Sequence, residues 1–119
     1  MLVSFEAGRS VDESELPHPL FVSAITLGEL RSGVLNAPNP PVTDLPLRTF
    51  TAAAQLGRLP VADAVVASWA RLRAALQIAG LKTGLNASWI AAAAMAHNLP
   101  VATQDDGFPE LDELSVMPV

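Results

Sequence analysis

The chain has 119 residues, half of them apolar, and it carries a net charge of −5 without any cysteine. This length suits one domain that buries its core without covalent staples, so we expect residues 1–119 to form a single domain. The lack of cysteine excludes disulfides and a cysteine zinc site, and it suits a reducing, cytoplasmic setting.

Charge and hydropathy also limit the partners. The acidic balance argues against non-specific nucleic-acid binding through a broad basic face, but it is compatible with a nuclease whose carboxylates hold Mg²⁺. The longest apolar stretch, residues 89–96, is too short to span a bilayer, and the first residues do not resemble a secretory signal. We therefore expect no membrane association.

Short apolar runs alternate with helical patterns along the chain. This alternation predicts an α/β fold in which a short parallel sheet is flanked by helices on both faces. In chain order, the first half is expected to form a buried strand over 20–25, a helix from Thr26, a proline-rich loop over 36–46 and a helix over 47–56. An extended piece over 59–61 and a helix capped by Asp63 and stopped at Gly80 follow. The last expected elements are an alanine-rich helix over 89–97, a buried strand over 99–103 and a strand over 115–117.

Two helix starts carry cap residues. Thr26 stands three residues before Glu29, which is the spacing of a capping box. Asn86 or Ser88 provides an N-cap for the alanine-rich helix.

Carboxylates follow two of the expected strands. Glu29 comes soon after the strand over 20–25, and Asp105 and Asp106 follow the strand over 99–103. Ligands of open parallel sheets collect at the carboxyl ends of the strands, and clustered carboxylates suit Mg²⁺ or Mn²⁺. A structural reading competes with this one, because Glu29 fits a capping box and the aspartates precede Gly107 in a typical turn.

Four segments of the chain shift this balance toward a functional site. They are Ser23–Val34 (SAITLGELRSGV), Trp69–Arg73 (WARLR), Gly84–Ala92 (GLNASWIAA) and Leu99–Asp106 (LPVATQDD). In their order and spacing they resemble the VapC-type toxins of the PIN-domain family. The resemblance implies a PIN-like three-layer fold and an endoribonuclease that uses Mg²⁺ or Mn²⁺ held by four acidic residues. It also implies a homodimer and a cognate antitoxin that blocks the RNA groove.

The resemblance is incomplete at the acidic site. Glu29 and Asp105 match two of the family's acids, whereas Ala87 stands where the family has a third. Residues 2–6 match the family's first helix, so the first central strand, together with its acid, is expected to be missing. Asp106 is a possible substitute ligand. We therefore expect a marginally stable chain and weak or absent metal-dependent RNA cleavage.

The alternative is a catalytically dead PIN domain that dimerises and binds an antitoxin. A third, weaker possibility is a PIN-like protein that acts on DNA. RNA or antitoxin contacts are expected from Arg31, Asn86 and Thr103, although Asn86 is also explained as a helix cap.

The other chemistry-bearing residues have plain structural readings. Trp69 and Trp89 could stack on RNA bases, but core packing is favoured. His97 suits the end of a helix dipole. Arg71, Arg73 and Lys82 could hold phosphates or the acidic part of an antitoxin, and solvated helix faces account for most such residues.

Overall fold

A short parallel sheet runs through the middle of this computed structural model, which describes residues 1–5, 12–16, 19–37, 40–105, 107–109 and 111–119. Within these residues the sheet has five strands in the order β3-β2-β1-β4-β5, and each neighbouring pair is parallel. The strands are β1 (Leu2–Ser4), β2 (Phe21–Ser23), β3 (Gly57–Leu59), β4 (Val101–Thr103) and β5 (Val116–Pro118).

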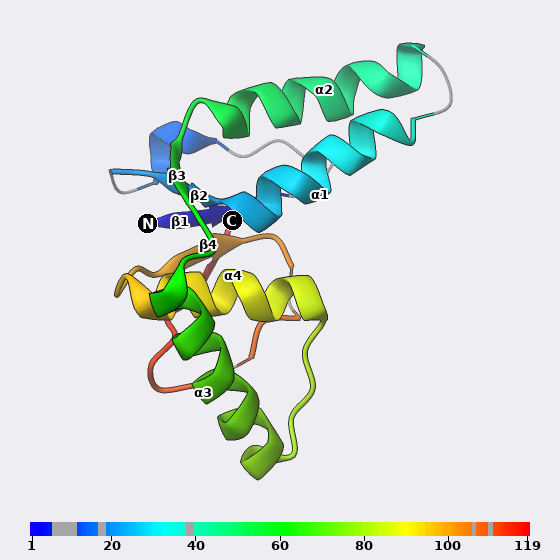
Figure 1. The fold of residues 1–119 in the computed structure, drawn as a ribbon. Helices are drawn as coiled ribbons and strands as arrows, with labels where there is room; N and C mark the ends of the chain where they lie inside the picture. Colours follow the sequence, from blue (N-terminus) through cyan, green and yellow to red (C-terminus); the bar gives the residue numbers. More distant parts are fainter. Residues whose placement is uncertain (6–11, 17–18, 38–39, 106, 110) are drawn as a thin grey trace.

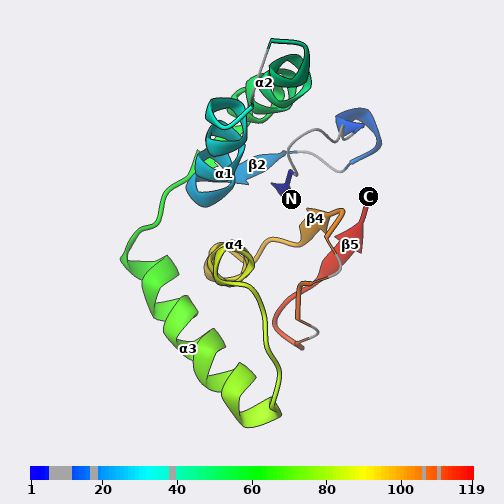
Figure 2. The same ribbon diagram turned by 90° about the vertical axis from the view of Figure 1, so that its right-hand side faces the viewer.

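Helices cover both faces of the sheet, as the alternation of patterns predicted (Figures 1 and 2). One face carries α1 (Ala24–Leu35) and α2 (Pro40–Ala54), and the other carries α3 (Asp63–Ala79) and α4 (Leu85–Ala96); a 3-10 turn, η1 (Glu13–Glu15), lies between β1 and β2 in the chain. In the described part of the chain, none of the helices combines the length and the apolar character that a membrane crossing needs.

The first strand is present, which corrects the expectation that it is missing. Leu2–Ser4 forms β1 at the centre of the sheet rather than part of a helix. Leu2 pairs with Phe21 on one side and with Val101 on the other. Both neighbouring strands are therefore paired, and the penalty for unpaired central strands, which motivated the expectation of marginal stability, does not arise.

The two cores lie on opposite faces of the sheet. Along β1, Leu2 packs into the core beneath α3 and α4, whereas Val3 packs into the core beneath α1 and α2. This alternation follows from the two-residue period of a strand. Leu72 and Leu30 are the largest fully buried helix residues of the respective cores. A short strand that is buried on both faces needs a continuous apolar run, not an alternating pattern. Residues 1–3 provide such a run.

The proline-rich segment is helical in part, contrary to the predicted loop over 36–46. Pro40 and Pro41 open α2, where the first backbone N–H groups have no helical acceptor, so proline loses nothing there. Pro46 lies inside α2. An internal proline removes one helical hydrogen bond, but tertiary packing of the same helix overrides that cost here; Ala53, for example, is completely buried.

Helix starts also differ from the prediction. The N-cap of α1 is Ser23, whose Oγ accepts a hydrogen bond from the N–H of Ile25 at 3.1 Å, so Thr26 lies inside the helix and no capping box forms with Glu29. The helices α3 and α4 begin after Ala62 and Gly84, without a side-chain cap. The predicted caps Asp63, Asn86 and Ser88 therefore lie within the first turns.

The predicted end of α3 is confirmed. Gly80 adopts a left-handed conformation with φ of 70°, which a residue with a Cβ adopts only with strain.

Candidate acidic site at the carboxyl edge of the sheet

Three neighbouring central strands end on hydroxyl residues at one edge of the sheet. Ser4, Ser23 and Thr103 close β1, β2 and β4, and all three are buried. Ser4 lies directly beside Thr103 in the parallel register. Because parallel strands share a carboxyl edge, the residues that follow these positions are brought to the same side of the molecule, where α/β proteins bind ligands.

Glu29 lies on the second turn of α1 and is exposed to solvent. Its carboxylate forms no hydrogen bond or ion pair with a residue that the structure describes. The capping role that competed with the functional reading is therefore wrong, because the helix begins earlier, after Ser23. Glu29 is therefore an exposed acid that neither caps the helix nor pairs with another described residue.

A shallow hollow joins α1 to the start of α4. Its volume is about 520 Å³, and it brings Glu29 together with Asn86, two residues that the sequence singled out separately. The sequence prediction missed Gly28 and Ser32, which line the same hollow. Helical spacing is the signal that could have found them, because Ala24, Gly28 and Ser32 recur every four residues on one face of α1. Small side chains on this face leave the space open.

Asp105 is held in a tight turn just after β4. Its backbone N–H donates to Thr103 Oγ1 at 3.0 Å, and its Oδ1 accepts from the N–H of Gly107 at 2.8 Å. The turn role predicted for Asp105 is thus confirmed, and Thr103 acts as its support. Asp105 and Thr103 line a second hollow of about 660 Å³, which extends toward β5 and does not include Glu29 among its described lining residues.

Ala87 lies on the first turn of α4, next to Asn86, and is half-buried against the core beneath α3 and α4. Its neighbour Ser88 is fully buried and fixes this turn. Ser88 Oγ donates to the carbonyl of Leu85 and accepts from Trp69 Nε1 at 3.0 Å. The start of α4 is therefore anchored to α3 immediately beside the position where an acid was expected from the resemblance.

Trp69 and Trp89 form a stacked pair between α3 and α4. Their ring centroids lie 4.5 Å apart and the ring planes differ by 5°. Both are half-buried and pack against the core, as the favoured reading predicted. Arg31 is exposed on α1 and does not line the hollow that holds Glu29, and His97 closes α4 as its C-cap residue.

The described residues do not fit a divalent cation as a complete ligand set. Among them, no three histidine, aspartate or glutamate side chains gather closely enough to hold a metal ion. Glu29 and Asp105 line separate hollows, and Ala87 offers no donor atom. Asp106, named from the sequence as a possible substitute ligand, lies outside the described residues.

The fold and the site together define a class of protein. The chain is a three-layer α/β protein in which acidic residues follow the strands at the carboxyl edge of a parallel sheet. Residues 5–114 match the PIN domain family.

Similar proteins narrow the class. Ribonuclease VapC5 of Mycobacterium tuberculosis is 40% identical over 112 residues, which cover 94% of this chain and 83% of that protein. Ribonuclease VapC4 of the same organism is 34% identical over 119 residues, covering 100% of this chain and 92% of that protein. The crystal structure of VapBC-5 from M. tuberculosis, a member of the VapBC family of toxin–antitoxin systems, superposes with a TM-score of 0.89 at 35% identity, covering 99% of this chain and 97% of that chain. This chain therefore belongs to the PIN-domain family and, within it, to the VapC type.

Proposed function

We propose that this chain is the toxin of a toxin–antitoxin pair, with the fold and partner binding of a VapC-type protein but weak Mg²⁺- or Mn²⁺-dependent cleavage of RNA. Relatives that are named ribonucleases support the RNA-directed activity. The observation that supports weak cleavage is that Glu29 and Asp105 line two different hollows. By the resemblance, Ala87 on the first turn of α4 also stands where the family has an acid.

Glu29 is the best candidate for a reacting-site carboxylate in this proposal. It is exposed, it forms no hydrogen bond or ion pair with a described residue, and it shares its hollow with Asn86, an amide that can orient a phosphate or a water molecule. Asp105 has one carboxylate oxygen engaged by Gly107, and its second oxygen remains for a ligand. The metal would supply charge neutralisation for phosphodiester cleavage, and Ala87 denies it one expected ligand.

The partners in this proposal are an RNA substrate, a cognate antitoxin and a second copy of the chain. Support for the antitoxin comes from the similar VapBC-5 structure, which is that of a member of the VapBC family of toxin–antitoxin systems. Arg31 is the proposed contact for an acidic part of the antitoxin or for RNA, because it is an exposed cation two residues beyond Glu29.

Restoring an acid at position 87 tests the proposal. We expect Ala87→Asp to raise Mg²⁺-dependent cleavage of single-stranded RNA at least about tenfold, corresponding to about 1.4 kcal/mol of transition-state stabilisation. The matched control is Ala87→Asn, which has nearly the same size without the charge and should leave cleavage at the starting level. Adding Glu29→Gln to Ala87→Asp should abolish the gain. Robust Mg²⁺-dependent cleavage by the unaltered chain that Glu29→Gln removes would falsify the proposed weakness.

The second candidate function is a binding module without catalysis. It is favoured by the absence of any gathered set of three acids in the described part of the chain. In that case, Ala87→Asp leaves cleavage unchanged, while the chain still binds its antitoxin with an affinity that neither Ala87→Asp nor Glu29→Gln alters.

A further inference from the structure

A third hollow, which neither Glu29 nor Asp105 lines, lies where α3 ends and the chain turns toward α4. Its volume is about 770 Å³. Two cations line it, Arg73 from the helix and Lys82 from the segment after it, together with the polar side chains of Gln77 and Thr83. None of the described residues that line it is a carboxylate.

Two other arginines have acidic side chains near them, unlike Arg73 and Lys82. Arg48 is bound to Asp44, and Arg71 shares its hollow with Asp112 and Glu113. Arg73 and Lys82 form no ion pair with any residue that the structure describes. In a chain of net charge −5, two unneutralised cations facing one hollow indicate a preference for an anionic ligand.

Contacts within the chain itself position both cations. The left-handed Gly80 ends α3, and the N–H of Leu81 returns to the carbonyl of Leu76 at 2.9 Å, so the chain reverses and brings Lys82 back over the helix end. The guanidinium of Arg73 lies 5.4 Å from the ring centroid of Trp69, which restricts its position by a cation–π contact.

A direct contact links this hollow to the acidic edge of the sheet. Thr83, which lines the hollow, donates from Oγ1 to the carbonyl of Gly107 at 3.0 Å. The N–H of the same Gly107 donates to Asp105 Oδ1. The turn that holds Asp105 is thus hydrogen-bonded, through Gly107, to Thr83 in the wall of this hollow.

We propose that the hollow lined by Arg73 and Lys82 binds backbone phosphates of single-stranded RNA, outside the acidic site. This inference rests on the proposed action on RNA, but it concerns binding rather than cleavage. RNA is favoured over an acidic protein segment or a second copy of the chain because Thr83, which lines the same hollow as the two cations, is hydrogen-bonded to the turn that holds Asp105, an acid proposed to face a phosphodiester. Phosphate contacts by arginine and lysine are independent of base sequence.

The test measures binding of a fluorescein-labelled single-stranded RNA oligonucleotide by anisotropy at several salt concentrations, in EDTA so that cleavage plays no part. Each phosphate contact on a single strand makes the slope of log affinity against log salt more negative by about 0.7. We expect Arg73→Gln/Lys82→Gln to make this slope shallower by about 1.4 and to weaken binding at low salt. Lys82→Gln alone, which leaves the Trp69 contact intact, should make it shallower by about 0.7. Arg58→Gln is the matched control, since Arg58 is an exposed cation on the edge strand β3 and should leave the slope unchanged.

Two results overturn the inference. One is that the unaltered chain does not bind the RNA. The other is a slope for the double variant that equals that of the unaltered chain and of Arg58→Gln; if sedimentation or the binding of an oligoglutamate peptide changes in the same variant, the hollow is assigned to a second copy or to an acidic partner. Failure of the proposed weak cleavage appears only in the Mg²⁺ assays of Ala87→Asp and Glu29→Gln, so the two failures are distinguishable.

Discussion

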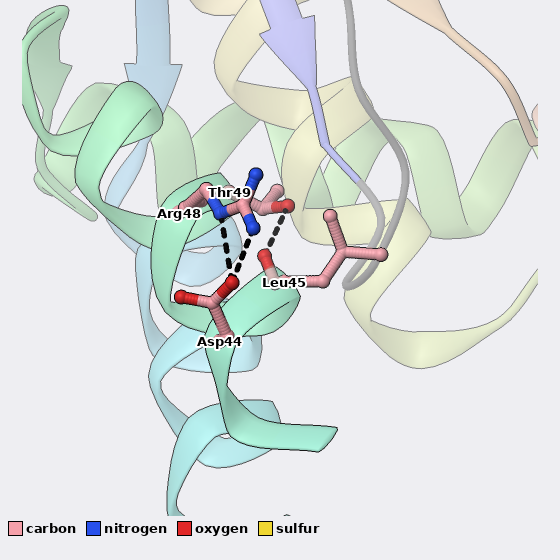
Figure 3. A network of polar contacts seen from close by, with 4 residues as sticks. All are labelled: Asp44, Leu45, Arg48 and Thr49. Carbon is pink, nitrogen blue, oxygen red and sulfur yellow. Dashed lines mark hydrogen bonds and ion pairs between the residues drawn. The ribbon is translucent and has the colours of Figure 1, made fainter. Parts of the chain in front are cut away.

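The two helix pairs that cover the sheet are held by different interactions. Between α3 and α4, the stacked rings of Trp69 and Trp89 and the hydrogen bond from Trp69 to Ser88 join one helix to the other. On the other face, the side-chain contacts within α2 are local: Arg48 binds Asp44, and Thr49 Oγ1 donates to the carbonyl of Leu45 at 3.1 Å (Figure 3).

This difference bears on the candidate site because each pair contributes one wall of the hollow. Asn86 and Ala87 sit on a turn of α4 that is fixed by a hydrogen bond from Trp69 on α3 to Ser88 and by a hydrogen bond from Ser88 to the carbonyl of Leu85 in the same turn. Glu29 sits on α1, which the buried side chains of Leu27 and Leu30 anchor by apolar packing. Apolar packing is less directional than a hydrogen bond. We therefore expect the turn of α4, which hydrogen bonds hold, to fix the direction in which a new acid at position 87 would point.

Truncation of one buried leucine on each face is the strongest way to separate the two cores. Leu72→Ala should lower the free energy of unfolding by about 2–5 kcal/mol, and Leu30→Ala should fall in the same range, because both side chains are fully buried. Only Leu72→Ala should change the native tryptophan fluorescence, since both tryptophans pack on its side. Urea unfolding followed by circular dichroism and fluorescence measures both effects. Equal changes in fluorescence for the two variants would contradict the division into two cores.

Much of the fold was predictable because apolar runs suit short strands buried on both faces. The strands near residues 20–25, 99–103 and 115–117 were predicted from such runs. The central strand was not, because the family resemblance assigned residues 2–6 to a helix. Three residues are too few for a periodic pattern, so only pairing on both sides establishes Leu2–Ser4 as a strand.

Individual residues of the candidate site could be predicted from the sequence, but their grouping in space could not. The sequence identified Glu29, Asn86 and Asp105, yet it could not show that the first two share a hollow while the third faces another. Helix starts were displaced because Ser23 at the end of β2 takes the cap that Thr26 was expected to provide. The basic hollow depends on the reversal at Gly80, which brings together residues nine positions apart, Arg73 and Lys82.

Comparing two tryptophan variants separates ring packing from the polar contacts of Trp69, which are the hydrogen bond to Ser88 on α4 and the cation–π contact with Arg73. Trp69→Phe and Trp89→Phe each replace one indole of the stacked pair by a smaller ring. Only Trp69 donates its Nε1–H to a described partner, the buried Ser88. Trp69→Phe should therefore destabilise the chain by about 0.5–1.5 kcal/mol more than Trp89→Phe does. Thermal or urea unfolding of both variants gives the difference, and equal losses would show that the bond adds nothing beyond ring packing.

The surface contact on α2 should have the smallest effect, and it should depend on pH. The hydrogen bond and charge of Arg48 hold the pKa of the Asp44 carboxyl below its ordinary value, and both groups are exposed. Because the folded-state pKa is lowered, the stabilisation is present above the unfolded pKa, near 4, and is lost as the pH falls through the folded pKa. Asp44→Asn should therefore lower the unfolding midpoint slightly at pH 7 and not at all at the acidic end of that window. Repeating the measurement at about 1 M salt should shrink the difference at pH 7, since salt screens exposed charges. A difference that persists at high salt or grows toward low pH would show that Asp44 stabilises α2 by some means other than its contact with Arg48.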